Sequence, residues 1–323
     1  MELTLNLDKI QSDNVSKYAK TILDKQNPYK NFKIENYKYA QLHRDIRSEI
    51  LQRDIDISEL LKISKNISTF SSNPVDLASN LNQWKYKNDD SFFRVSSLLK
   101  RDTSSINLDL IDDKNLFLDI SQINNNIHFL KSSKNEINLI IMNTKSKDEY
   151  PKSIFFDISN NSNLNVIHFN ISNFKSFLYF ESNLQDNSHL NFVSFQSDNI
   201  HTRNEFYASL NLECNFDLFG LNINNYGVND NYSFIQHLKP SSSSREIFKS
   251  IVEKGAITNF QGKIYVDSIA QKTDGYQMSR SLLLDDISKA NNKPELEIYA
   301  DDVKCSHGST VSKLDEDQIY YFK

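Results

Sequence analysis

A short segment near the middle of this 323-residue chain occurs twice, 26 residues apart. Residues 161–166 read NSNLNV and residues 187–192 read NSHLNF, and Phe169 returns at the same offset as Phe195. The Ile-Asn-Leu of residues 137–139 matches the apolar-Asn-apolar core of the repeat at an offset of 27. Short strands with a period in the twenties are typical of a solenoid, in which each coil covers the core of its neighbour.

The chain is expected to form strands from about residue 105 onward, because its apolar pattern there has a period of two. In residues 208–218, apolar and polar residues alternate without interruption. We interpret this segment as one half-buried strand with its apolar side inward. An antiparallel sandwich also contains many short strands, but the 26-residue spacing and the presence of only six glycines favour a parallel β-helix.

The first part of the chain has a helical rather than a strand pattern. Residues 13–28 carry apolar side chains three and four positions apart, and Pro28 prevents the helix from continuing. A second helical pattern covers residues 46–61. We therefore divide the chain into a mostly helical N-terminal region, 1–95, and a β-helix domain, 96–323.

Composition excludes several classes of function. The formal net charge is −5 and no basic stripe is present, which argues against nucleic acid as a partner. No apolar run approaches the roughly 18 residues of a membrane span, and the first residues lack the pattern of a signal peptide. Two cysteines do not make a disulfide framework. The chain is predicted to be a cytoplasmic protein without a membrane anchor.

The two cysteines differ in their surroundings. Cys214 lies on the apolar side of the segment 208–218 and is expected to be an inert, buried thiol. Cys305 comes two residues before His307, and both are predicted to lie on one face of a strand, roughly 6.6 Å apart. Thiolate and imidazole are ligands that suit Fe, Zn and Cu(I), and iron–sulfur clusters accept both. Because two ligands do not complete such a site and no other His or Cys is near in the sequence, the site is either incomplete alone or shared with a second chain.

Other interpretations of these residues remain open. Cys305 can equally be a core thiol beside a hydrogen-bonded histidine. A nucleophile paired with its base is less favoured, because a strand holds the two side chains parallel. Gln271 and Asp274 can either face a partner or order a turn, and Asp301 and Asp302 either supply oxygen ligands or break a strand. Five other histidines show no ligand spacing and are interpreted as structural or solvent-facing: His128, His168, His189, His201 and His237.

The last seventy residues contain an ordered series of motifs. They are Phe260-x-Gly262-x-Ile264, Ala270-Gln271-x-Thr273-Asp274, Leu282-Leu283-Leu284, Pro294-x-Leu296-x-Ile298, Ala300-Asp301-Asp302-Val303, His307-Gly308-x-Thr310 and Leu314-Asp315-Glu316. In this series the chain resembles the SufB/SufD family of iron–sulfur cluster assembly proteins, closely in its last quarter and loosely elsewhere. Gly308 after the histidine is typical of the SufD branch, since SufB-type chains tend to carry Glu there.

The resemblance implies a fold and a function. The fold is a mainly β, right-handed parallel β-helix with a small helical N-terminal region. The function is that of a scaffold without enzymatic activity, which pairs with a SufB-like chain through the β-helix and works with a SufC-like ATPase. A transient iron–sulfur cluster, or iron, is expected at the interface of the two chains. His307 is the ligand implied on this side, with Cys305 next to it, and Gln271, Asp274, Asp301 and Asp302 are candidate interface residues.

The resemblance also changes one local prediction and leaves alternatives. Residues 247–252 followed by Gly255 have a helical pattern, but the family has strands there, so we predict a strand. Relatives continue into C-terminal helices that contact SufC, whereas this sequence stops at Lys323, so SufC binding is in doubt. As an alternative to a SufB-like partner, two identical chains can pair. The rival functions are a β-helix enzyme acting on polysaccharides, which would need paired carboxylates in a cleft, and a purely structural subunit that stabilises SufB.

Overall fold

The computed structural model describes residues 70–71, 91, 93, 97, 101, 103–111, 114–143, 151–171, 175–197 and 200–313. The helices predicted over 13–28 and 46–61 lie outside these residues. Phe93 and Ser97 are helical, and strands run from residue 103 onward. Among the described residues, no helix is long and apolar enough to span a membrane.

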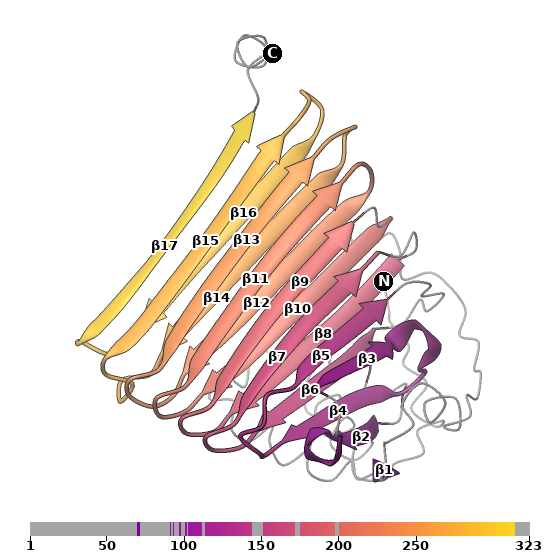
Figure 1. Ribbon diagram of the computed structural model, residues 1–323. Coiled ribbons are helices and arrows are strands. Elements are labelled where there is room, and N and C mark those ends of the chain that lie inside the picture. Colours follow the sequence, from indigo (N-terminus) through magenta and orange to yellow (C-terminus); the bar gives the residue numbers. More distant parts are fainter. Residues whose placement is uncertain are drawn as a thin grey trace, which may run out of the picture.

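The strands alternate along the chain between two sheets, which form the walls of one long stack (Figure 1). The nine-stranded sheet has the order β1-β2-β4-β6-β8-β10-β12-β14-β16, and we call it sheet A. Its strands are β1 (Phe70–Ser71), β2 (Thr103–Asn107), β4 (Asn126–Lys131), β6 (Lys152–Ile158), β8 (Lys175–Leu184), β10 (His201–Leu210), β12 (Val228–His237), β14 (Ile257–Val266) and β16 (Lys289–Ile298).

The eight-stranded sheet has the order β17-β15-β13-β11-β9-β7-β5-β3, and we call it sheet B. Its strands are β3 (Asn115–Asp119), β5 (Asn138–Asn143), β7 (Asn163–Asn170), β9 (His189–Ser197), β11 (Asn215–Asn224), β13 (Ser243–Val252), β15 (Thr273–Leu283) and β17 (Val303–Lys313). Two 3₁₀ turns, η5 (Leu108–Leu110) and η6 (Ile120–Gln122), follow β2 and β3.

The pairing of these strands confirms the predicted parallel β-helix and makes the antiparallel sandwich wrong. Among the described strands, the short β1 pairs antiparallel with β2, and the other pairings are parallel. The repeat that predicted the fold is in register, since Leu164 pairs with Leu190 and Phe169 with Phe195 across β7 and β9. Asn138 of the preceding coil pairs with Asn165. The sequence repeat is therefore one turn of the β-helix.

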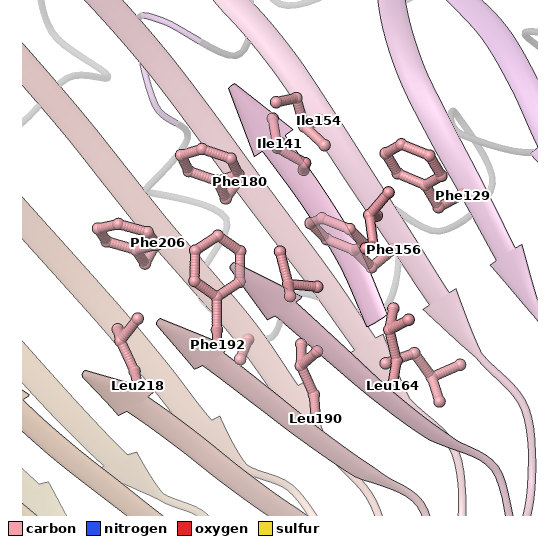
Figure 2. Packing of buried hydrophobic residues seen from close by; sticks show 14 of the residues in the cluster. Phe129, Ile141, Ile154, Phe156, Leu164, Phe180, Leu190, Phe192, Phe206 and Leu218 are labelled. Atoms are coloured by element: carbon pink, nitrogen blue, oxygen red, sulfur yellow. The ribbon is translucent and has the colours of Figure 1, made fainter. Parts of the chain in front are cut away.

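The core lies between the two sheets, where alternate side chains of each strand point inward (Figure 2). Phenylalanines of adjacent coils stack in sheet A, as in the pair Phe180 and Phe206 with ring centroids 5.2 Å apart. Phe192 of sheet B meets both rings edge-on, at 5.1 and 5.4 Å. Aromatic pairs of this kind contribute about 0.5–1.5 kcal/mol beyond their buried area, so the stacked coils stabilise one another.

Left-handed turns join β-strands at one corner of successive coils. In five successive coils, from the β6–β7 turn to the β14–β15 turn, one turn residue has positive φ, and a small buried residue follows it directly. The positive-φ residues are Asn161, Asn187, Glu213, Ser241 and Lys272, and the buried residues after them are Ser162, Ser188, Cys214, Ser242 and Thr273. Asn tolerates this conformation better than most residues with a side chain, which explains the Asn-Ser of the sequence repeat.

Two local predictions are resolved by these strands. Residues 208–218 are not one strand, because β10 ends at Leu210 and β11 begins at Asn215, with Glu213 at φ 55° between them. The apolar alternation continues through this turn because Cys214 points inward in phase with the flanking strands. Residues 247–252 belong to strand β13, so the prediction made from the family is confirmed and the helical pattern was misleading.

A buried ion cluster lies on the outer face of sheet A. The Arg203 guanidinium contacts Glu205 Oε1 at 2.9 Å and Asp230 Oδ2 at 2.8 Å, and its side chain is 2% exposed. Ser91 donates a hydrogen bond to Glu205, which links the segment before β2 to β10. Burial raises the pKa of Glu205, and the Arg203 charge opposes that rise. Phe93, stacked on Phe177 at 5.5 Å, adds an apolar contact on the same face.

Candidate functional site: the inward face of the last coil

Cys305 and His307 lie on β17, the last strand of sheet B and the outermost strand in Figure 1. The strand begins at Val303, directly after a bend at Asp301 and Asp302, as predicted from the break in alternation. The parallel pairing of β15 with β17 sets Gly275 opposite Cys305 and Gln277 opposite His307. The two predicted ligands therefore share one face of one strand.

His307 ends a line of side chains that crosses the whole of sheet B. Strand register places one residue of each of the eight strands in this line: Leu116, Leu139, Val166, Phe192, Leu218, Glu246, Gln277 and His307. We call these eight residues the inner line. Its first five members are apolar and belong to the core, and its last three are polar. Because side chains of a strand alternate between faces, His307 points to the same side as Phe192.

Cys305 is half-buried at the edge of a small apolar cluster. It packs with Leu296 and Val303 against a group of four buried residues, Ile264, Val266, Ala270 and Ala300. Its Sγ lies over Gly275, where an added Cβ would come within 3.2 Å of the sulfur. Burial raises the pKa of the Cys305 thiol, a backbone hydrogen bond from Gly275 opposes this, and Asp274 adds to the rise. The thiol is thus protonated at neutral pH, and a metal would have to displace its proton.

His307 is exposed at the end of the stack. The described residues contain no group of three or more His, Cys, Asp or Glu side chains placed to hold a metal ion. Cys305 and His307 are two candidate ligands, and the described part of the chain brings no third His, Cys, Asp or Glu side chain to them in metal-binding geometry. The arrangement can hold one side of a metal or cluster whose other ligands come from a second chain.

Two polar residues behind His307 were not predicted from the sequence. Glu246 and Gln277 are fully buried, and the Gln277 Nε2 donates a hydrogen bond to Glu246 Oε1 at 3.3 Å. Burial raises the pKa of Glu246 to about 7, while the hydrogen bonds of Ser233 and Gln277 oppose the rise. The sequence could have indicated Glu246, because it occupies an inward-facing position in the alternation of residues 243–252. The helical pattern of residues 247–252 made that alternation hard to recognise.

The structure places the candidate interface residues at the turn beside β15 and β17. Gln271 Nε2 donates to the Ser268 carbonyl at 2.9 Å, and Gln271 Oε1 accepts the Asp302 N–H at 2.9 Å. Asp274 forms an ion pair of 2.9 Å with Arg245 on the outer face. Asp301 and Asp302 are exposed. Gln271 thus joins two turns of consecutive coils, and these residues do not converge with Cys305 and His307 on the inward face.

Cys214 and the five other described histidines are buried or make contacts within the fold. Cys214 is fully buried, and burial raises its pKa, as expected for an inert thiol. His168 and His237 are also buried, and burial lowers the pKa of each to about 3. His128 contacts Asp157 at 2.8 Å, and His189 contacts Asp217 at 3.2 Å. His201 packs edge-on against Phe177 at 5.5 Å.

Comparison with known proteins agrees with this geometry. Residues 124–323 match the family described as SUF system FeS cluster assembly, SufBD core domain. The chain is 43% identical over 96 residues to the iron–sulfur cluster assembly protein SufD of Escherichia coli. The aligned segment covers 30% of this chain and 23% of that protein. The chain is 41% identical over 96 residues to a SufBD family protein of Synechocystis, covering 30% of this chain and 21% of the relative. Protein ABCI7, chloroplastic, of Arabidopsis thaliana is 46% identical over 85 residues, 26% of this chain and 18% of the relative.

The β-helix and these matches define the class of protein. The chain belongs to the SufB/SufD family, on its SufD branch. The matched segments span about a fifth to a quarter of these curated relatives.

Proposed function

We propose that this chain is a SufD-type scaffold subunit for iron–sulfur cluster assembly, in which His307 and Cys305 bind iron or a nascent cluster together with a partner chain. The observation that carries the proposal is the position of both side chains on the inward face of β17, where the stack of described strands ends. Imidazole and thiolate are ligands that iron and iron–sulfur clusters accept. The cluster is the cargo of the protein, and the chain itself performs no catalysis.

The partner we propose is a SufB-like chain that meets this one through the β-helix. A tetrahedral metal or a cluster takes about four ligands, and the described part of this chain offers two in one place. A second copy of this chain is the alternative partner. ATP hydrolysis would come from a SufC-like ATPase, and we propose the cytoplasm as the compartment.

Cluster binding through Cys305 requires loss of its proton. Since burial raises the pKa of this thiol, iron binding is expected to strengthen as pH rises. His307, which is exposed, would make the first contact. Cys305 would follow as a ligand, or its thiolate would take the outer sulfur of a donor's persulfide and release the donor's thiolate.

A purely structural SufB-stabilising role is the second candidate. It is favoured by the packing of Cys305 in the apolar cluster of Ile264, Val266, Ala270 and Ala300. In that case Cys305 acts as a small core residue, and its thiol has no chemical role.

Anaerobic co-expression with SufB-like and SufC-like partners separates these functions. The chain is pulled down, and bound partners, iron and sulfide are measured for the wild type, His307→Ala and Cys305→Ser. We expect His307→Ala to keep its partners and to lose iron and sulfide, because a ligand is removed from an exposed position. Normal iron and sulfide in both variants would favour the structural role.

Matched controls come from the same chain. Cys214→Ser changes a thiol at a turn position where neighbouring coils carry Ser188 and Ser242, and His189→Ala removes an exposed histidine from the outer face of sheet B. Both controls should retain the wild-type iron content. Loss of iron in Cys214→Ser would show that the assay reports folding instead of ligation.

A further inference from the structure

Gln277 connects a buried carboxyl group to the proposed ligand. It lies between Glu246 and His307 in the inner line, one strand away from each. Adjacent strands are about 4.8 Å apart, so the side chains of Gln277 and His307 are direct neighbours on the inward face. Glu246, by contrast, reaches His307 only through Gln277.

The orientation of the Gln277 amide follows from its contact with Glu246. Gln277 Nε2 donates to Glu246 Oε1 at 3.3 Å, and above its pKa of about 7 the Glu246 carboxyl is ionised and can only accept hydrogen bonds. The amide oxygen Oε1 is therefore not the atom that contacts Glu246 on β13. On its other side, β15 pairs with β17, the strand of His307. Among the described residues, Gln277 Oε1 has no hydrogen-bond partner.

The surroundings hold this amide in place. Gln277 is fully buried, and a Cβ at Gly262 on β14 would overlap its amide group. The glycine therefore leaves the space that the amide fills. A buried carbonyl oxygen without a hydrogen-bond partner is costly. A ring N–H of the neighbouring histidine that reached Gln277 Oε1 would remove this cost.

Histidines that ligate metals usually donate their second ring N–H to a carbonyl or carboxylate, which fixes the tautomer and the ring orientation. We propose that Gln277 is a positioning residue for His307: the buried Oε1 of Gln277, which has no partner in the described part of the chain, accepts a ring N–H when the His307 ring turns toward it, so that the other ring nitrogen is presented bare to the metal. Glu246 anchors the amide from the far side. This inference rests on the proposed function of His307 as a ligand.

The test measures the tautomer of His307 in the whole chain without metal. Histidine ring nitrogens are labelled with ¹⁵N, long-range ¹H–¹⁵N spectra are recorded at pH 8, and the His307 signals are assigned by their loss in His307→Ala. In the wild type we expect one dominant neutral tautomer. In Gln277→Leu the ratio of tautomers should shift about fivefold toward the other form, since a single neutral hydrogen bond is removed. In the exchanged pair Glu246→Gln, Gln277→Glu, which keeps one donor facing one acceptor between the two residues and an acceptor oxygen at position 277, the wild-type ratio should return.

Gln236→Leu is the matched control. Gln236 is also fully buried, its Nε2 also donates one hydrogen bond, to Ser209 Oγ at 2.7 Å, and its Oε1 also lacks a partner among the described residues. It lies on sheet A, outside the inner line. An unchanged His307 tautomer in Gln236→Leu together with the shift in Gln277→Leu supports the proposal. An unchanged tautomer in Gln277→Leu, or an equal shift in both variants, overturns it.

A second measurement separates this inference from the proposed function. In the complex purified with its partners, the chelator concentration that removes half of the iron should fall about tenfold in Gln277→Leu, as for other residues that orient a ligand. Absence of iron from the wild-type complex counts against the proposed function and leaves the tautomer measurement valid. Iron that is retained equally by the wild type and Gln277→Leu counts against the role of Gln277.

Discussion

The inner line of sheet B differs between its two ends. In the coils up to β11 it consists of apolar residues, and Phe192 is packed among other aromatic rings. In the last three strands the same line consists of Glu246, Gln277 and His307. The backbone ladder is the same in both regions, so the difference lies in the side chains alone. The apolar side chains of the coils up to β11 stabilise the fold by packing against one another. In the coils from β13 to β17, polar side chains take the same positions, next to the proposed ligands.

The two regions should respond to pH in opposite directions, and the largest effect is expected from His168 in the apolar region. Its pKa is about 3 in the folded chain, against 6.5 unperturbed. The wild type should therefore lose stability relative to His168→Phe as pH falls from about 6.5 to 3, by about 5 kcal/mol at most. Urea unfolding of both proteins at several pH values measures this difference. Parallel pH curves would contradict the prediction.

Removal of a large side chain should cost more in the apolar part of the inner line than in its polar part. Phe192→Ala is expected to lower the free energy of unfolding by about 3–5 kcal/mol, because a cavity remains among the stacked rings. Gln277→Ala should cost clearly less, since little apolar area is lost. Chemical denaturation of the two variants beside the wild type tests the difference, and equal costs would refute it.

Glu246 should give the opposite pH dependence to His168. Its pKa is about 7 in the folded chain, against 4.5 unperturbed, so the folded state resists its ionisation. As pH rises from about 4.5 to 7, the wild type should lose about 3 kcal/mol of stability relative to Glu246→Gln. Denaturation at pH 5 and pH 8 measures this change. A constant difference between the two proteins would show that Glu246 does not titrate in this range.

The smallest effect is expected on the outer face of sheet B. Arg245 and Asp274 form an ion pair, but their side chains are 38% and 45% exposed. Arg245→Ala should therefore change the stability by less than about 1 kcal/mol, and the difference should shrink in high salt. Thermal unfolding at low and high salt is sufficient to test this. A loss above 2 kcal/mol would mean that the pair supports the turn beside Cys305.

Most of the fold could be predicted from local patterns. The Asn-Ser repeat marks a left-handed turn and the small residue after it, and strand register confirms its period. Residues 247–252 show the limit of such patterns. Their apolar spacing fits a helix, but they form a strand because β13 pairs with β11 and β15. The junction at Glu213 was missed for a related reason, since the turn preserves the apolar alternation.

The sequence by itself determined that the chain coils with a period in the twenties and that Cys305 and His307 share a face, because both follow from the spacing of residues along one backbone. Only the tertiary structure decided which residues stand behind them. Glu246 and Gln277 lie 31 residues apart, whereas the repeat predicted coils of 26. Turns of different length change the number of residues per coil, and hydrogen bonding between strands then sets which side chains meet. No local pattern records that register, so the environment of His307 emerges only when the coils are stacked.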